Sequence, residues 1–379
     1  MTTPTRAADI LARRLYEAGC RHAFGMPGGE VLTLVDALEA AGIRFHLAKH
    51  ETAAGFIGEG VFHHDGAPVI LLATLGPGVL NGTNVIANAH QDRVPMVVLT
   101  GCADAAEEQS YTHQVLDHRA VFAPITKATF RLDAGAAGII IDKAVSIALE
   151  PRQGPVLVDV PISAAAAPAS DRNIRRAPAS ASAPSGEALA QARSWLAAAE
   201  QPVAVIGLDA LQENAGAAIR AFVETRQIPF ITSYKAKGII PEDHPLCLGG
   251  AGLSPLADKH LLPLVREADL VLSIGYDPIE MRPGWRNVWD VETQNVIDIA
   301  PEANTHYMHQ AGLNFLTAVA PTLEALSKDT SPRETWSNGR PVAVKSALAE
   351  AFPHDEDWGP GGVIAECRAT LPPETLATA

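Results

Sequence analysis

Short apolar runs alternate with amphipathic, helix-like segments along the first 160 or so residues of the chain. Five of these runs are typical of buried β-strands: "RHAFGMPG", "RFHLAKH", "PVILLATLG", "PMVVLTG" and "GPVLVDVPI". Strands that recur between helical segments indicate βαβ units, in which the strands are parallel and helices cover the sheet. The pattern therefore predicts a doubly wound α/β domain.

A second series of the same kind follows, with "QPVAVIGLDA", "IPFITSYKAKG", "ADLVLSIGYDP" and "NVIDIAP" as its strands. Its length suits a six-stranded, Rossmann-like doubly wound domain. The stretch "AAAAPASDRNIRRAPASASAPS" between the two series is rich in Ala, Pro and Ser, which indicates an exposed linker. After a second connector, "KDTSPRETWSNGRP", come a Gly/Pro start, a helical pattern over 363–371 and the opening of a strand.

These patterns divide the chain into two complete domains and the start of a third. One helix and one strand cannot bury a core, so we expect the chain to be truncated before that third domain. The expected segments are 1–168 for the first domain, 169–185 for a linker, 186–328 for the central Rossmann-like domain, 329–357 for a second linker and 358–379 for the beginning of a diphosphate-binding domain.

Composition and charge narrow the classes of partner. A formal charge of -14 repels polyanions, so neither nucleic acid nor an anionic membrane is an expected partner, and a small molecule is favoured. The N-terminus lacks the apolar core of a signal peptide and no run is long enough to span a membrane, so a cytoplasmic location is expected. The four cysteines are widely spaced, which predicts reduced thiols and no metal site.

Two glycine-rich turns are candidates for ligand binding. In "TLGPGVLN", Gly76, Pro77 and Gly78 follow a strand and precede a helix, where glycines allow a ligand to approach the backbone and helix N–H groups are exposed. The turn "FGMPGGE" has the same character. Each could equally be a tight turn that serves packing alone, so neither specifies a function by itself.

The stretch "KHETAAGF" places Glu51 where a strand gives way to an apolar, glycine-containing helix. One interpretation is that this acid merely complements the helix dipole. The other is functional, because a carboxylate buried beside an apolar pocket has a raised proton affinity and can share a proton with a ligand. The neighbouring His50, and also His90, are expected to have structural roles.

The order of the motifs resembles a known family. "FGMPGG", "KHE", "TLGPGVLN" and "YTHQVLDHRAVFAPITK" together are similar to the pyrimidine-binding domain of thiamine diphosphate enzymes of the acetolactate/acetohydroxyacid synthase group. In the central segment, "AKGIIPEDHP" and "ADLVLSIGYDPIE" also resemble that group. The "THQ" and "GYDPIE" elements are similar to its catabolic, flavin-independent acetolactate synthases.

The resemblance implies roles for seven residues. The glutamate of the family's H-E pair hydrogen-bonds N1′ of the cofactor pyrimidine and thereby promotes loss of the thiazolium C2 proton, and Glu51 occupies this position. Gln114 corresponds to an amide that reaches the active site and can bind substrate, with His113 before it as in the catabolic enzymes; an ordinary loop glutamine is the alternative. The positions that correspond to the cofactor-binding loops are Gly25, Pro27, Thr74, Gly78 and Asn81.

Some positions depart from the family pattern. Leu75 stands where a serine is common and Thr52 where a glutamine is common, which affects substrate preference more than the class of cofactor. The central segment has "VIGLDALQENAG" in place of G-x-G-x-x-G, so FAD is not expected there. The G-D-G motif that holds Mg²⁺ and the cofactor diphosphate in the family does not occur, so no metal ligand is predicted and both would need the absent C-terminal domain.

The resemblance thus implies a thiamine diphosphate-dependent carboligase or decarboxylase of 2-oxo acids such as pyruvate. As in the family, we expect a homodimer or homotetramer in which Glu51 of one subunit meets the diphosphate domain of another. The alternative is a non-catalytic subunit or truncated remnant with a structural or regulatory role. Glu51, Gln114 and the glycine turns favour the first function, and the missing anchor for the diphosphate favours the second.

Overall fold

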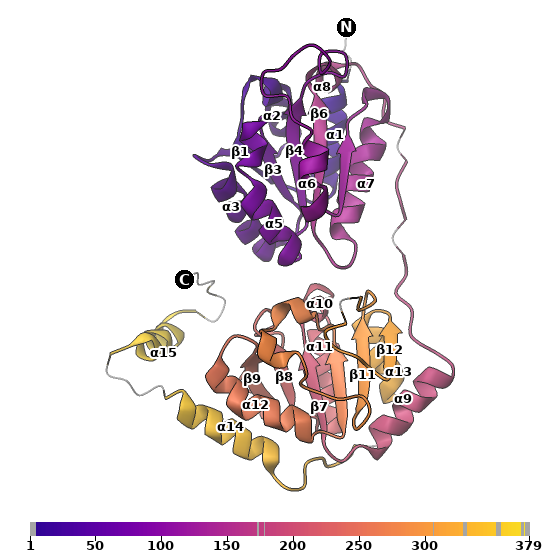
Figure 1. Ribbon diagram of the computed structural model, residues 1–379, viewed down its shortest axis with the longest axis vertical. Helices are drawn as coiled ribbons and strands as arrows, with labels where there is room; N and C mark the ends of the chain where they lie inside the picture. Colours follow the sequence, from indigo (N-terminus) through magenta and orange to yellow (C-terminus); the bar gives the residue numbers. More distant parts are fainter. Residues whose placement is uncertain are drawn as a thin grey trace. The chain divides into compact units, whose positions relative to one another are not determined.

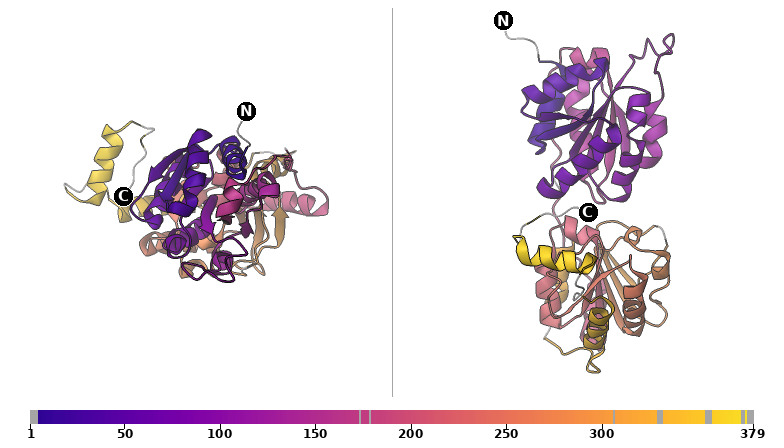
Figure 2. Two further views of the ribbon diagram at one scale, coloured as in Figure 1. Left: turned by 90° about the horizontal axis from the view of Figure 1, so that it is seen from above. Right: turned by 90° about the vertical axis from the view of Figure 1, so that its left-hand side faces the viewer.

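The computed structural model describes residues 5–172, 174–177, 179–305, 307–328, 332–353, 358–372 and 375. The chain divides into two compact units, residues 1–179 and 180–379. Each unit contains one six-stranded sheet in which all paired strands are parallel, with helices against the sheet (Figures 1 and 2). The expected α/β class with two doubly wound parallel sheets is therefore confirmed.

The sheet of the first unit has the strand order β2-β1-β3-β4-β6-β5. Its strands are β1 (His22–Met26), β2 (Arg44–Leu47), β3 (Val69–Ala73), β4 (Met96–Cys102), β5 (Ala128–Arg131) and β6 (Pro155–Pro161). Its helices are α1 (Ala7–Glu17), α2 (Leu32–Ala40), α3 (Glu51–Asp65), α4 (Pro77–Leu80), α5 (Thr83–Gln91), α6 (His118–Phe122), α7 (Ala137–Leu149) and α8 (Ile162–Ala166). Apolar residues of α1, α2 and α7 form one core on the sheet, and those of α3, α5 and α6 form another.

The sheet of the second unit has the order β12-β11-β10-β7-β8-β9. Its strands are β7 (Pro202–Ile206), β8 (Phe230–Ser233), β9 (Cys247–Ala251), β10 (Leu270–Ile274), β11 (Asn295–Ala300) and β12 (Leu313–Leu316). Its helices are α9 (Glu187–Ala198), α10 (Leu208–Gln212), α11 (Gly216–Arg226), α12 (Pro255–Glu267), α13 (Val319–Ser327), α14 (Arg340–Ala351) and α15 (Pro360–Thr370). Cores form on both faces of this sheet as well. In the described part of the chain, no helix has the length and apolarity that crossing a bilayer requires.

Several elements differ from the sequence expectations. The apolar runs did not reveal β5, β9 and β12, which complete the two sheets. The segment 329–357, expected to be a linker, contains the twelve-residue helix α14. Its Val344 is buried in one of the cores of the second unit. The helical pattern expected over 363–371 is observed as α15 over 360–370, and most residues of the strand expected after it lie outside the described residues.

The N-terminal and C-terminal segments of the first unit contact each other. Arg6 forms a β-bridge with Pro168, and the buried guanidinium of Arg14 donates to the Asp171 carboxylate, with an Nε to Oδ2 distance of 3.0 Å. Further along, the side chain of Arg176 pairs with Glu150. The first part of the segment expected to be a linker is therefore held against the unit that precedes it.

Candidate functional site

The predicted site residues of the first unit follow the carboxyl ends of neighbouring strands. Gly25 lies in β1, Thr74 follows β3, and Glu51 opens α3 just after β2. Because the strands are parallel and adjacent, their carboxyl ends meet at one edge of the sheet, which is where ligands bind in open α/β folds. Glycine is required at position 25, since an added Cβ would lie 1.8 Å from the carbonyl oxygen of Leu72 in the neighbouring strand.

Helix α3 is held close to the sheet by its own glycines. A Cβ at Gly55 would come within 2.4 Å of Val85 in α5, and one at Gly58 within 2.3 Å of Val69 in β3. The helix begins at Glu51, where the His50 ring accepts a hydrogen bond from the Thr52 backbone N–H. This close packing fixes where the Glu51 side chain lies.

The Glu51 carboxyl group is buried, with 3% of the residue exposed. Its Oε2 atom has no hydrogen-bond partner among the described residues. A buried carboxyl oxygen without a donor is costly, because folding removes water without replacing its hydrogen bonds. The position is the kind of site that a proton-sharing ligand would satisfy.

Only glycine fits at position 78, in the narrow gap between Thr74 and Glu51. A Cβ at this glycine would lie 2.5 Å from the Thr74 methyl carbon and 3.7 Å from Glu51 Oε1. The Thr74 hydroxyl donates to Glu30 Oε2 over 2.7 Å, and a Cβ at Gly28 would crowd both of these groups. The structure therefore brings together three residues predicted as site residues, Glu51, Thr74 and Gly78, and adds Glu30, which was not predicted.

The other predicted residues lie around these. Pro27 is half-buried after β1. Asn81 is exposed at the end of α4, and its backbone carbonyl accepts a hydrogen bond from the Thr52 hydroxyl. Gln114 is exposed with a positive φ of 58° and packs its backbone on Gly76, where a Cβ would lie 2.5 Å from the Gln114 carbonyl oxygen. Gln114 thus belongs to the glycine turn and has no described contact with Glu51.

A buried histidine, which was not predicted as a site residue, supports this turn. His118 Nε2 accepts a hydrogen bond from the Gly76 backbone N–H over 2.8 Å, and His118 Nδ1 lies 2.9 Å from Asp159 Oδ1. Because Nε2 accepts, Nδ1 carries the proton and donates to the carboxylate. The only signal in the sequence was a histidine four residues after Gln114, and nothing local connects it with an aspartate 41 residues later.

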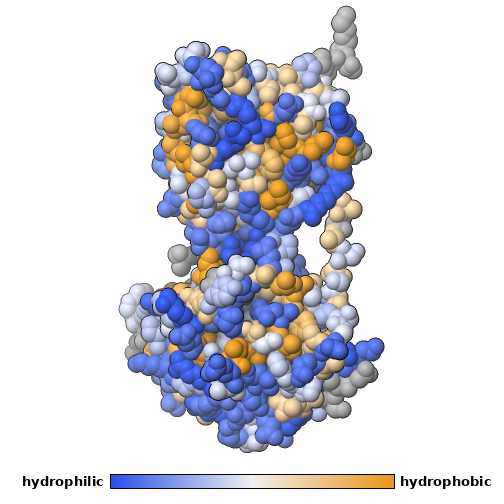
Figure 3. All heavy atoms as spheres, turned by 45° about the vertical axis from the view of Figure 1, so that its right-hand side comes forward, coloured by the Kyte–Doolittle hydropathy of each residue, from blue (hydrophilic) through white to orange (hydrophobic). Residues whose placement is uncertain are grey.

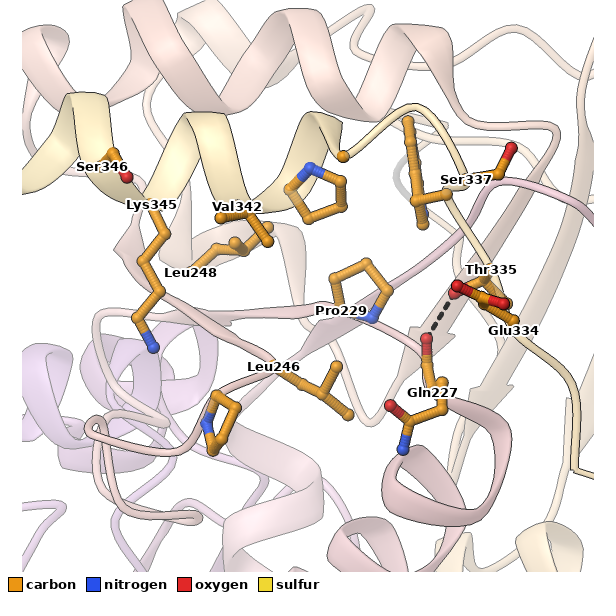
Figure 4. Close-up of a pocket in the computed structure, with 14 residues that line it drawn as sticks. Gln227, Pro229, Leu246, Leu248, Glu334, Thr335, Ser337, Val342, Lys345 and Ser346 are labelled. Carbon is orange, nitrogen blue, oxygen red and sulfur yellow. Dashed lines mark hydrogen bonds between the residues drawn. The ribbon is translucent and has the colours of Figure 1, made fainter.

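A cavity of about 420 Å³ adjoins the turn, lined by Glu30, Leu75, Ala103, Glu107, Ser110, Tyr111, His113, Gln114 and Ile162. This volume lies in the range of small-molecule sites. A larger cavity, about 580 Å³, lies in the second unit, where α14 faces the residues before β8 and β9 (Figure 4). There Lys345 donates to the backbone carbonyl of His244, and none of the predicted site residues is present. The smaller cavity, which the predicted site residue Gln114 lines, is therefore the candidate site.

In the second unit, the crevice at the reversal of strand order is filled by the protein's own backbone and side chains. The strand order reverses between β10 and β7, the place where doubly wound folds bind dinucleotides. A Cβ at Gly207, just after β7, would lie 2.4 Å from the Tyr276 backbone and 2.9 Å from Glu280 Oε2. Glu280 accepts hydrogen bonds from the Leu208 N–H and the Ser233 hydroxyl. Burial raises the pKa of this carboxyl group to about 7.

Cysteine chemistry does not contribute to the site. All four cysteines are free, and three of them are buried. Burial raises the pKa of Cys102, at the end of β4, to about 12, so the thiol stays protonated at neutral pH.

Comparison with known proteins agrees with this geometry. Residues 5–121 match the family described as thiamine pyrophosphate enzyme, N-terminal TPP binding domain, and residues 189–326 match the thiamine pyrophosphate enzyme central domain. An acetolactate synthase from Bacillus subtilis is 30% identical over 360 residues, which are 93% of this chain and 62% of that protein. A probable 2-ketoarginine decarboxylase from Pseudomonas aeruginosa is 33% identical over 276 residues, 71% of this chain and 48% of that protein.

A solved structure gives the same fold. A Mycobacterium smegmatis protein, solved as a candidate thiamin diphosphate-dependent enzyme, aligns with a TM-score of 0.74 at 20% identity, covering 88% of this chain and 66% of that one. The chain spans less than two thirds of the length of these relatives. The matched families, the strand orders and the ordered motifs agree with one another, and the chain therefore belongs to the thiamine pyrophosphate enzyme family, of which it carries the N-terminal and central domains.

Proposed function

We propose that this chain serves a thiamine diphosphate-dependent carboligation or decarboxylation of 2-oxo acids, similar to that of acetolactate synthase. The observation that carries the proposal is the buried Glu51 Oε2 atom, which has no hydrogen-bond partner among the described residues. When bound, the cofactor would supply a carbanion that attacks the oxo carbon of the substrate. The relatives named as acetolactate synthases support pyruvate as a candidate substrate.

The residues present fit the aminopyrimidine end of thiamine diphosphate. Glu51 would hold a proton at Oε2 and share it with a ring nitrogen, which exchanges an unsatisfied oxygen for a hydrogen bond. Because Gly78 carries no side chain, a ring that pairs with Glu51 would meet only backbone at this position, and the backbone groups of Gly25 and Pro27 would border it. Gln114, in the adjoining cavity, is placed to bind the substrate or its adduct through its amide.

The diphosphate end of the cofactor would also need a metal ion or other positive groups to offset its charge. In the described part of the chain, no group of three or more His, Cys, Asp or Glu side chains is placed to hold a metal ion. We therefore propose no Mg²⁺ ligand among these residues. The alternative function, a non-catalytic subunit with a structural or regulatory role, stays a second proposal. For the central unit, we propose that it binds no FAD at the strand-order reversal, because Glu280 and the backbone of Tyr276 occupy that crevice.

We also propose that the edge of the sheet next to Glu51 is covered by a second copy of the chain in a homodimer or homotetramer. Large apolar side chains are exposed there, at the end of β2 and on α3: Leu47, Phe56 and Ile57. On the face drawn in Figure 3, hydrophobic residues lie scattered at the surface among hydrophilic ones. Sedimentation equilibrium tests this proposal, and a monomer at micromolar concentration would contradict it.

The test of the catalytic proposal is Glu51→Gln in an assay in which the chain is supplemented with the subunit or domain that carries the diphosphate site. The amide has nearly the shape of the carboxyl group but cannot share its proton in the same way. We expect the exchange of the cofactor C2 proton, followed by NMR after acid quench, to slow about 10²- to 10⁴-fold, the usual effect of losing a positioned acid–base group. Pyruvate turnover should fall with it.

Two comparisons make this test decisive. Glu39→Gln makes the same chemical change at an exposed position of α2 and should leave C2 exchange unchanged. Gln114→Ala should alter substrate choice or later steps while C2 exchange stays near that of the parent. Exchange in Glu51→Gln as fast as in the parent would refute the role of Glu51 and favour the non-catalytic alternative.

A further inference from the structure

The cavity beside the Gly76 turn has a distinctive charge. Two carboxylates, Glu30 and Glu107, line it with His113, and no lysine or arginine is among its lining residues. Arg131 lies behind the lining, where it donates to the Ala103 carbonyl and pairs with Glu108. A cavity built only for a small anionic 2-oxo acid such as pyruvate would gain nothing from two carboxylates, because like charges repel in a partly desolvated space. The charge of the lining therefore indicates something about the substrate beyond its 2-oxo acid group.

Glu30 is held in a fixed orientation with one oxygen left over. Its Oε2 accepts the Thr74 hydroxyl over 2.7 Å, and the absence of a side chain at Gly28 makes room for this contact. Its Oε1 makes no hydrogen bond or ion pair with any described residue. The residue is half-buried, so a cation that pairs with Oε1 would be only partly exposed to solvent screening.

Glu107 contributes a second acceptor at the rim. It begins a turn in which the Ser110 and Tyr111 N–H groups donate to the Glu107 backbone carbonyl, and its exposed side chain has no partner among the described residues. By contrast, the neighbouring Glu108 is paired with Arg131 and does not line the cavity. Arg131 thus neutralises an acid that does not line the cavity, whereas the two acids that line it pair with no cation among the described residues.

From this arrangement we propose that the cavity selects a 2-oxo acid whose side chain ends in a cation, with Glu30 and Glu107 as specificity-determining residues. A guanidinium group suits them well, because it is planar, always charged and presents several N–H donors to carboxylate oxygens. Gln114, on the same cavity, would bind the polar head of the substrate while the cationic end reaches Glu30. This inference rests on the proposed function of the site and specifies its substrate class.

The test measures binding alone. The probes are 4-guanidinobutanoate and 4-ureidobutanoate, which have nearly the same shape and differ by one positive charge. Calorimetric titration into the full chain at low salt should show the guanidino probe binding at least about tenfold more tightly. This preference should shrink as salt is raised, since the carboxylates are partly exposed.

Variants identify the residues responsible. Glu30→Gln should reduce the preference to within about twofold, and Glu107→Gln, at the exposed rim, should reduce it about threefold. Glu39→Gln removes the same charge from an exposed position on α2 and should leave the preference intact. Circular dichroism of each variant checks that the fold is preserved.

Three results would overturn the inference: equal binding of the two probes, a preference that survives in Glu30→Gln, or no binding of either probe at millimolar concentration. The probes lack the 2-oxo group, so their binding does not depend on thiamine chemistry. Normal C2 exchange in Glu51→Gln would therefore defeat the proposed function without affecting the binding result. Conversely, pyruvate turnover combined with equal binding of the probes would defeat only the cationic specificity.

Discussion

Replacing Glu280 with glutamine should change how the stability of the second unit depends on pH. Desolvation by burial, reinforced by the nearby Asp277, raises the pKa of this carboxyl group from 4.5 to about 7 in the folded chain. The hydrogen bonds from Ser233, Leu208 and Asp277 oppose that shift without cancelling it. A carboxyl group with a raised pKa binds its proton more tightly in the folded state than in the unfolded state.

The sign and size follow from this difference. Below about pH 4.5 both states are protonated, and the contribution of Glu280 to the free energy of unfolding is fully present. Between pH 4.5 and 7 the unfolded state loses its proton first, so the free energy of unfolding falls and the loss is complete above about pH 7. At about 1.4 kcal/mol for each pKa unit, the change amounts to roughly 3 kcal/mol.

The assay is urea unfolding monitored by tryptophan fluorescence at several values between pH 4.5 and 8. All five tryptophans lie beyond residue 180, so the signal reports on the second unit alone. Glutamine can donate to the Ser233 hydroxyl and accept from Leu208 without titrating. The stability of Glu280→Gln relative to the parent should therefore rise by roughly 3 kcal/mol over this range.

Glu292→Gln, at an exposed position of the same unit, is the control and should follow the parent at every pH. A difference between Glu280→Gln and the parent that stays constant to within about 0.5 kcal/mol across this range would refute the reasoning, because the pKa shift would then contribute nothing.

Two further predictions concern the first unit. Gly78→Ala should destabilise it by about 1–3 kcal/mol, because the new Cβ meets the Thr74 methyl at 2.5 Å. Gly60→Ala, with no atom within 4 Å of the new Cβ, should instead stabilise α3 by up to about 1 kcal/mol. Thermal unfolding compares the two variants, and equal effects on the melting temperature would contradict the crowding at Gly78. His118→Phe should cost at least about 2 kcal/mol in the same assay, since it leaves Asp159 and the Gly76 N–H buried without this partner; an unchanged melting temperature would argue against that role.

The sequence was most informative where strands are long and buried on both faces. β3, β4, β6 and β7 are buried throughout and appear as continuous apolar runs, so their pattern alone predicted the sheets. The missed strands are sheet edges: β5 and β12 have four residues each, and β9 contains two glycines. An edge strand buries less surface, so its sequence carries a weaker apolar signal.

The same limit applies to the site. Glu51, Thr74 and Gly78 could be singled out because they belong to short ordered motifs, and the structure places them close together, while their roles stay a prediction. The His118–Asp159 pair could not, because it joins a loop to a strand that is adjacent only in the folded sheet. Glu30 ends the "FGMPGGE" turn, but its significance depends on the cavity that it shares with Glu107, which no local pattern reveals.

The contacts between the N-terminal and C-terminal segments of the first unit affect how this unit folds during translation. The buried residue Arg14 emerges from the ribosome early, yet its partner Asp171 is 157 residues further along. At translation rates of about 5–20 residues per second, α1 waits roughly 8–30 seconds for that partner. Helix α1 must therefore remain beside an unfinished sheet during synthesis, which makes slow translation through this region a period of exposure to chaperones and proteases.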